Sequence, residues 1–317
     1  MKNGKIRIGV SSCLLGNQVR FDGSHKYNSY INLTLSKYLE FHPFCPEVAI
    51  GLGTPRPPIR LIKTHTGVHA VGVKDPELDV TDRLERYGIT TREKLEKKFC
   101  GFIFKSKSPS CGMERVKVYG SRGAAQSNGT GIFAAAILSG LPDMPVEEEG
   151  RLMDPVIREN FIERVFCYSR WHDMTALGLT AARLIDFHTR HKFVLLSHDE
   201  TAYRELGKII AHCGKRNIDS VATTYLQQFM AAMKKKATKR RHTNVLMHIA
   251  GFFKKDLDAD DKKELLEVIH AYRTEEVPLI VPITLLKHYL RKFPNEYIAG
   301  QYYMQPHPKE LMLRNHI

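Results

Sequence analysis

The chain has 317 residues, a length that suits two domains better than one. Its 43% hydrophobic and 26% charged residues are typical of a globular protein with a buried core, and they exclude a disordered chain, a collagen or a disulfide scaffold. The formal charge of +14 indicates an anionic partner, with nucleic acid first and a membrane surface second, although a basic solvated surface would explain the same excess.

Short apolar runs separated by Gly, Pro, Ser and Asn fill the first part of the chain. Strands are predicted at Lys5–Val10, Val68–Val73 and Gly101–Lys105, and helices at Leu33–Phe41, Thr90–Phe99 and Gly131–Leu138. This alternation predicts an α/β domain over residues 1–145, with a Rossmann-like layered sheet that is parallel or mixed. The glycine-rich turn Ser127–Gly131 precedes the third helix, whose first amides could hold an anion.

A linker is predicted where two prolines, a glycine and an acidic run interrupt the periodicity, over residues 141–150. Beyond it the pattern is almost entirely helical, which predicts an all-α domain over residues 151–317. The predicted helices are Pro155–Trp171, Thr175–Leu196, Asp199–Cys213, Ile218–Met233, Thr243–Lys254, Ala259–Arg273 and Pro282–Phe293. Thr175, Asp199 and Asp258 are the predicted N-caps.

No stretch of about 18 consecutive apolar residues occurs, so no membrane-spanning helix is expected. The first ten residues run straight into a predicted strand and do not resemble a signal peptide, so a cytoplasmic protein is expected. The six cysteines should then be reduced, and any special ones should be catalytic or should bind a metal.

Three cysteines of the first domain share a setting, because Cys13, Cys45 and Cys111 all lie in loops at or after predicted strand ends. In an open α/β sheet the ligand crevice lies outside the carboxyl ends of the strands. Their spacing matches no zinc-ribbon or ferredoxin pattern, so each could also be a small buried hydrophobic residue. The flanking Pro, Ser and Gly argue against plain core packing. Cys100, Cys167 and Cys213 lie on helix-like segments or their ends and are interpreted as packing residues.

Several motifs resemble a known family. Val10-Ser-Ser-Cys-Leu-Leu-Gly16 with Val19-Arg-Phe-Asp-Gly23, Cys45-Pro-Glu47 with Gly53-Thr-Pro-Arg-Pro-Pro58, and Lys107-Ser-Pro-Ser-Cys-Gly112 are similar to the thiouracil desulfidase (TudS) family. Residues 151–317 resemble the YbgA-like helical domain, through Phe187-His-Thr-Arg-His-Lys192 and Tyr203-Arg-Glu-Leu-Gly207. The combination resembles RudS-type proteins, in which the fused domains act on 4-thiouridine in transfer RNA.

The resemblance implies a [4Fe-4S] cluster held by three cysteines, which carry over to Cys13, Cys45 and Cys111. It implies an iron without a protein ligand, able to bind the sulfur of a thiocarbonyl base as a Lewis acid. Water would then replace the sulfur by oxygen with no net redox change. The expected substrate is a thiolated uracil, first of all 4-thiouridine in tRNA, and the expected product is sulfide.

The same motifs imply two further roles. Glu47 would be the general base or proton shuttle, and Ser108 would hydrogen-bond the substrate or the water. Glu47 could instead be a loop-stabilising acceptor, and Ser108 a turn-forming hydroxyl with Ser110 as its rival. Arg20, Asp22, Arg56 and Lys107 could orient the substrate or pair structurally.

The densest basic run is a candidate RNA contact. It consists of Lys234, Lys235, Lys236, Lys239, Arg240 and Arg241. Phosphate contact would relieve the repulsion among these cations, but a solvated loop between two helices is the alternative. Tyr203, Tyr297, Tyr302 and Tyr303 could stack on an unpaired base or belong to the core, and His188, His191 and His198 could contact phosphate or be buried. Rival functions are desulfuration of free thiobases, RNA binding without turnover, and a zinc or redox protein using the same cysteines.

Overall fold

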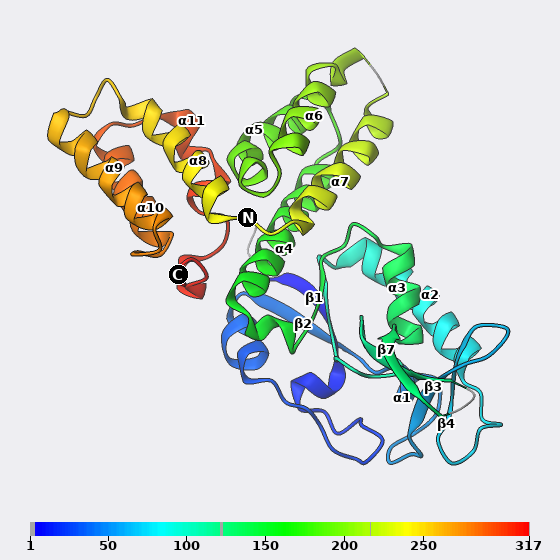
Figure 1. Cartoon of the computed structure of the whole chain (residues 1–317). Coiled ribbons are helices and arrows are strands. Elements are labelled where there is room, and N and C mark those ends of the chain that lie inside the picture. Colours follow the sequence, from blue (N-terminus) through cyan, green and yellow to red (C-terminus); the bar gives the residue numbers. More distant parts are fainter. Residues whose placement is uncertain (1–3, 121–122, 216, 317) are drawn as a thin grey trace. The chain divides into compact units, whose positions relative to one another are not determined.

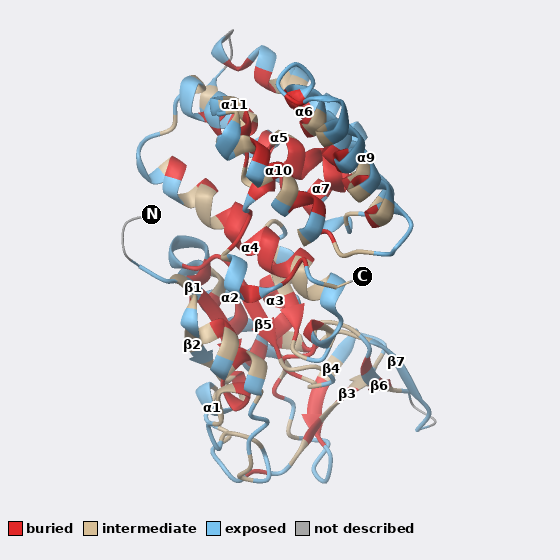
Figure 2. Cartoon of the chain, turned by 90° about the vertical axis from the view of Figure 1, so that its left-hand side faces the viewer, coloured by how far each residue is buried: buried red, intermediate tan, exposed pale blue. Residues whose placement is uncertain are grey.

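The computed structural model describes residues 4–120, 123–215 and 217–316. The chain divides into two compact units, Met1–Asp154 and Pro155–Ile317, and each is described by itself. Figures 1 and 2 show their elements and their buried residues.

The first sheet of the first unit is parallel throughout. It contains β1 (Ile6–Ser11), β2 (Leu39–Phe44), β5 (Phe102–Phe104) and β8 (Val146–Glu148), in the order β2-β1-β5-β8. The three residues of β5 are fully buried, as are Ile8 and Val10 of β1. Gly9 of β1 has no room for a side chain, since a Cβ there would lie 2.3 Å from the Phe102 ring. Close packing of β1 against β5 therefore depends on this glycine.

A second sheet is mixed. It contains β3 (Ile59–Lys63), β4 (Val68–Gly72), β6 (Val116–Tyr119) and β7 (Ala125–Gly129), in the order β4-β3-β6-β7. β3 pairs antiparallel with β4 and parallel with β6, which pairs antiparallel with β7. The helices α2 (Thr81–Lys98) and α3 (Ile132–Gly140) pack against each other, with Tyr87 stacked on Phe133 at 5.5 Å between ring centroids. The predicted α/β class, with parallel and mixed sheets, is confirmed.

The second unit is helical, and none of its described residues forms a strand. Its longer helices are α4 (Pro155–Ala176), α5 (Ala181–His198), α6 (Glu200–Ala211), α7 (Ile218–Lys234), α8 (Lys239–Ala250), α9 (Ala259–Arg273) and α10 (Ile280–Lys292), followed by the short α11 (Glu296–Ala299). Trp171, Phe187, Tyr225 and Phe229 form a buried aromatic cluster between α4, α5 and α7. The all-α prediction is confirmed. No described helix is both long enough and apolar enough to span a membrane.

Three local predictions are wrong. The helix predicted at Leu33–Phe41 is replaced by short 3-10 and π turns over residues 30–37, after which β2 starts at Leu39 and pairs with β1. The predicted linker contains β8, whose backbone pairs with β5. Strand pairing outweighs local propensity in both segments, because each supplies the missing neighbour of a buried strand.

The third error concerns a cap. Thr175 lies inside α4, where its hydroxyl donates to the Trp171 carbonyl, and Thr180 caps α5 instead. Asp199 and Asp258 cap α6 and α9 as predicted.

Candidate active site

The three cysteines of the first unit follow three neighbouring parallel strands. Cys13 lies in the 3-10 turn Ser12–Leu15 directly after β1, and Cys45 follows β2 as the N-cap of α1 (Pro46–Ala49). Cys111 lies in the loop that follows β5. Because β2, β1 and β5 are adjacent and parallel, their carboxyl ends meet at one edge of the sheet. The fold therefore brings together cysteines that are far apart in the chain.

All three cysteines line one cavity with a volume of about 350 Å³. Glu47, Ser108 and Ser110 line the same cavity, as do the cationic side chains Arg20, Lys26, Arg56, Lys105 and Lys107. Cys13 and Cys111 are buried, Cys45 is half-buried, and none of them forms a disulfide. Cys100, Cys167 and Cys213 are also buried, but they do not line this cavity.

Burial governs the ionisation of these thiols. It raises the pKa of Cys13 to about 11, against the opposing effect of the nearby Lys105 ammonium. It also raises the pKa of Cys45, and raises that of Cys111 further still. A Cys45 thiolate would raise the pKa of both other thiols, so the three sulfurs interact electrostatically. A positively charged centre is what would hold all three as thiolates.

The thiols do not form a site for a single ion. In the part of the chain that the structure describes, no group of three or more His, Cys, Asp or Glu side chains could hold one metal ion. A single zinc ion binds each sulfur at about 2.3 Å, which places its sulfur ligands within about 4 Å of one another, whereas the sulfur ligands of a cubic iron–sulfur cluster lie about 6–7 Å from one another. Three thiols on separate loops that line one cavity fit the larger group.

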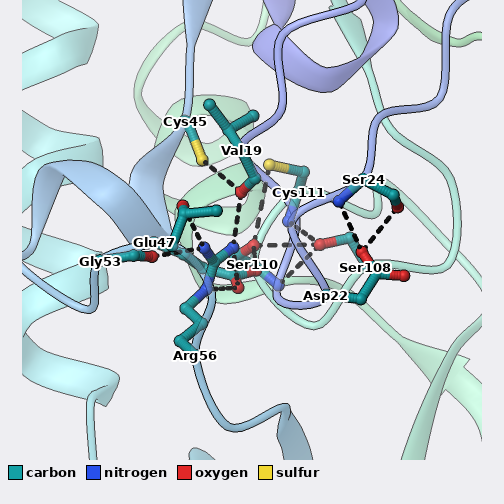
Figure 3. A network of polar contacts seen from close by, with 11 residues as sticks. Val19, Asp22, Ser24, Cys45, Glu47, Gly53, Arg56, Ser108, Ser110 and Cys111 are labelled. Atoms are coloured by element: carbon teal, nitrogen blue, oxygen red, sulfur yellow. Dashed lines mark hydrogen bonds and ion pairs between the residues drawn. The ribbon is translucent and has the colours of Figure 1, made fainter.

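A buried ion pair orients Glu47. The Glu47 Oε2 atom accepts a hydrogen bond from Arg56 Nε at 2.9 Å and lies 2.7 Å from Arg56 Nη2. Arg56 also donates to the carbonyl of Gly53 at 2.8 Å and to that of Val19 at 3.0 Å. Figure 3 shows this guanidinium between Glu47, Gly53 and Val19. Arg56 thus connects the loops that follow β1 and β2, and because it binds only Oε2, it leaves Glu47 Oε1 available to another group.

That other oxygen is bonded to Ser110. The Ser110 hydroxyl donates to Glu47 Oε1 at 2.6 Å, while Ser108 Oγ lies 3.0 Å from Ser110 Oγ. Ser108 Oγ accepts from the backbone amides of Ser110 and Cys111 at 3.3 and 3.1 Å. The hydroxyl that contacts Glu47 directly is therefore Ser110, which the sequence presented only as a rival to Ser108. Two serines separated by one proline were the only signal for it in the sequence.

The N-terminus of α3 secures the loop that carries Cys111. The amides of Gly131, Ile132 and Ala134 donate to the carbonyls of Gly112, Pro109 and Ser110 at 2.8, 3.1 and 3.1 Å. A Cβ at Gly131 would lie 2.5 Å from the Ser110 carbonyl oxygen, so the close approach requires glycine. The expectation that these amides bind an anion is wrong, because backbone carbonyls of the cysteine loop already use them.

The acidic run at the end of β8 secures the same loop from another direction. Glu148 Oε1 accepts from the amides of Met113 and Glu114 at 2.8 and 3.3 Å. Glu149 accepts from the Ser106 amide at 2.7 Å and pairs with the Lys105 ammonium. Sequence reasoning missed this role, since three carboxylates after a proline resemble a solvated linker.

This arrangement makes a testable prediction about stability. We expect Glu149→Ala to lower the free energy of unfolding by about 1–3 kcal/mol, because it removes the acceptor of the Ser106 amide and the counter-charge of the Lys105 ammonium. Chemical denaturation of the full chain measures the change. Glu85→Ala on the exposed surface of α2 is the control and should change the free energy of unfolding by less than about 0.5 kcal/mol. Equal effects of the two variants would show that Glu149 does not secure the loop that carries Cys111.

The six cations of the basic run differ in their surroundings. Lys234 ends α7, and Lys239, Arg240 and Arg241 form the first turn of α8. Lys235 pairs with Asp199, Lys239 pairs with Glu275 at 2.8 Å, and Arg241 donates to the His198 carbonyl at 2.8 Å. Lys236 and Arg240 are exposed and form no ion pair with any described residue.

Most aromatic and histidine candidates of the helical unit belong to its interior. His188, His191, His198 and Tyr303 are at most 3% exposed. Tyr302 is enclosed by Arg170 and Arg190, whose guanidinium carbons lie 3.8 and 4.4 Å from its ring centroid. Tyr203 and Tyr297 are half-buried. The histidines therefore contribute to packing and internal hydrogen bonds in this unit.

Comparisons with known proteins match the two parts separately. Residues 8–149 match the family model described as 2-thiouracil desulfurase, and residues 192–308 match that of a protein of unknown function, DUF1722. The uncharacterized protein YbgA of Escherichia coli (strain K12) is 35% identical over 153 residues, which cover 48% of this chain and 90% of YbgA. Among solved structures, a [4Fe-4S]-dependent thiouracil desulfidase, TudS, is 31% identical, with 47% of this chain and 95% of that chain covered and a TM-score of 0.37.

Proposed function

Because this chain belongs to the family of YbgA and carries a 2-thiouracil desulfurase domain ahead of its DUF1722 part, we propose that it is a desulfidase of thiolated uracil, with 4-thiouridine in tRNA as its substrate. The reaction replaces the sulfur of the base by oxygen from water and releases sulfide. One observation carries the proposal: three thiols from the ends of three adjacent strands share a cavity with a carboxylate and two hydroxyls.

Cys13, Cys45 and Cys111 would hold a [4Fe-4S] cluster in this cavity. When bound, such a group supplies an iron without a protein ligand, a Lewis acid with affinity for sulfur. All three thiols line the cavity, and the Lys105 ammonium favours a thiolate at Cys13, while the Glu149 carboxylate paired with Lys105 opposes it more weakly.

The protein's own groups manage the water and the proton. Glu47 lies two residues after Cys45, and Arg56 orients its carboxylate at the cavity wall. In this proposal Glu47 takes a proton from the attacking water, and Ser108 hydrogen-bonds the water or the base. The oxygen of that water forms a bond to the ring carbon, and hydrosulfide leaves with the electron pair of the C–S bond. The ring carbon and the sulfur keep their oxidation states in this exchange, so the reaction requires no reductant.

Transfer RNA as substrate is supported by charge and by architecture. A free thiouracil is small and uncharged, and a cavity of about 350 Å³ suffices for it without a basic helical unit. A base within folded RNA must be unstacked at a cost of a few kcal/mol, which phosphate contacts offset. The formal charge of +14 and the exposed cations Lys236 and Arg240 can supply such contacts.

Sulfide release tests this proposal. Anaerobically purified, iron-loaded protein should release sulfide from 4-thiouridine tRNA, with kcat/KM falling steeply as salt is added, whereas turnover of free 4-thiouracil should hardly depend on salt. Turnover of the free base alone would favour a thiobase desulfidase. An iron-loaded protein that binds tRNA without releasing sulfide would favour a non-catalytic RNA-binding protein.

The exposed cations give a second test. We expect Lys236→Gln with Arg240→Gln to weaken tRNA binding and to reduce the slope of log K against log salt by up to about 1.8, at about 0.9 for each phosphate that the variant no longer neutralises. Replacing all six cations of the run should lower the slope further. The matched control is Lys254→Gln with Lys255→Gln, which removes the same charge from another exposed turn. Equal slopes for both double variants would place the RNA-binding surface elsewhere.

A further inference from the structure

We infer that Ser110 is a positioning residue that joins Ser108 to Glu47, so that the three side chains form one proton relay at the wall of the cavity. The inference rests on the proposed desulfidase function and adds a residue to it. It follows from the direction of the hydrogen bonds, from burial, and from the supports on both sides of Ser110.

The direction of the hydrogen bonds follows from counting protons. The Ser110 hydroxyl has one proton, and its shortest polar contact is Glu47 Oε1 at 2.6 Å. Glu47 is paired with Arg56, so its carboxylate accepts that proton in a charge-assisted bond. Ser110 Oγ then has only lone pairs to offer Ser108 at 3.0 Å, so Ser108 donates. The order is Ser108 to Ser110 to Glu47.

Ser108 has no competing acceptor among the described residues. Its oxygen already accepts from the amides of Ser110 and Cys111, and these amides cannot accept its proton. The hydrogen-bonding neighbour that does have free lone pairs is Ser110 Oγ. Ser108 is half-buried and lines the cavity, whereas Ser110 is only 1% exposed. The relay therefore starts at a hydroxyl that bound water can reach and passes through one that bulk water cannot.

Both ends of the relay are held in place. Arg56 binds Glu47 Oε2 through two nitrogens, which leaves Oε1 facing Ser110. The α3 amide of Ala134 donates to the Ser110 carbonyl, and the Gly131 backbone packs against it. The Ser110 hydroxyl also lies 3.8 Å from the Cys111 sulfur. Buried hydroxyl groups are hydrogen-bonded in most proteins, and the nearest partner of the Ser110 hydroxyl is the Glu47 carboxylate.

The proton balance is simple. A water bound beside Ser108 gives its proton to Ser108, while the Ser108 proton moves to Ser110 and the Ser110 proton moves to Glu47. Both serines end with one proton each, Glu47 becomes a carboxylic acid, and hydroxide attacks the ring carbon. The proton on Glu47 then leaves with the released sulfide as hydrogen sulfide or passes to solvent.

The test compares Ser110→Ala, Ser110→Thr and the control Ser139→Ala in iron-loaded protein, with free 4-thiouracil as substrate so that RNA binding plays no part. Ser139 is exposed on α3, where its hydroxyl bonds only a backbone carbonyl. We expect Ser110→Ala to keep its iron and its KM within about twofold while kcat falls about 100-fold. Ser110→Thr should recover part of kcat because it restores the hydroxyl, and Ser139→Ala should match the wild type.

A double-mutant cycle separates a relay from a structural role. If Ser110 acts through Glu47, Ser110→Ala added to Glu47→Gln should reduce kcat little beyond Glu47→Gln alone. Additive losses, a normal kcat for Ser110→Ala, or a loss of iron in Ser110→Ala would each overturn the relay. A wild-type protein that releases no sulfide from any thiolated uracil would instead overturn the proposed function, and the relay with it.

Discussion

Single replacement of Cys13, Cys45 or Cys111 by Ser is expected to abolish both iron–sulfur loading and sulfide release. Each residue would supply one of three thiolates, and each comes from a different loop, so no neighbouring cysteine can take its place. Loss of an outer hydrogen-bond partner already lowers metal affinity by about 10–100-fold, so loss of a ligand should lower it by more than about 100-fold. Iron and acid-labile sulfide per chain, measured after anaerobic reconstitution, test the prediction.

The chain offers its own controls for this experiment. Cys100, Cys167 and Cys213 are buried but do not line the cavity, so their Ser variants should keep iron and activity if they fold. The free energy of unfolding should be measured for all six variants, so that a loss of iron can be told from a loss of structure. A variant of Cys13, Cys45 or Cys111 that retains full iron content would be removed from the ligand set.

The second large effect is expected at Glu47. Glu47→Gln should keep the cluster and lower kcat by about 10²–10⁴-fold, because Gln has the shape of Glu but cannot take the proton of the attacking water. The measurement is kcat for free 4-thiouracil, normalised to iron content. A near-normal kcat at full iron content would end the assignment of Glu47 as the base.

Stability has to be measured together with this change in rate. Arg56 is 9% exposed and would lose its counter-charge in Glu47→Gln, and breaking a buried ion pair costs about 3–5 kcal/mol. Glu77→Gln is the control, since Glu77 is exposed and lies outside the cavity. We therefore expect Glu47→Gln to be less stable than Glu77→Gln and still folded enough for its cluster content to be compared.

The strands that could be predicted are those with a clear apolar pattern. β5 is fully buried and β1 is buried from Ile8 to Ser11, and the boundaries of both strands lie within one residue of the predicted ones. β7 reads Ala-Gln-Ser-Asn-Gly, is mostly exposed, and carries no pattern that predicts a strand. β3 and β6 were also missed, although both contain buried residues. Pairing with a neighbour defines such strands, and a single sequence does not report which segments become neighbours.

The helical unit was predicted more accurately because helices form within one segment. The 3.6-residue periodicity identified seven helices between Pro155 and Phe293, and all seven occur, α9 with the predicted bounds and the others with one or both ends shifted. Which side chains of these helices are buried was less predictable. Tyr303, which the sequence offered as a residue that could stack on an unpaired base, is fully buried, since aromatic side chains at helical spacing contribute to the core.

The candidate site shows the same division. The sequence alone identified the candidate residues for the chemistry: three cysteines in shaped loops, a glutamate two residues after one of them, and serines before another. Tertiary structure decided how they meet: β2, β1 and β5 lie side by side and deliver the loops to one edge, Arg56 takes one oxygen of Glu47, and Ser110 takes the other. In the tertiary structure the segment predicted as an acidic linker forms β8 and binds the loop that carries Cys111. Three cations of the basic run bind groups that are distant in the chain, namely Lys235, Lys239 and Arg241. The physical reason is that residue type and local periodicity are properties of a segment, whereas the pairing of strands and of buried charges depends on segments that are distant in the chain.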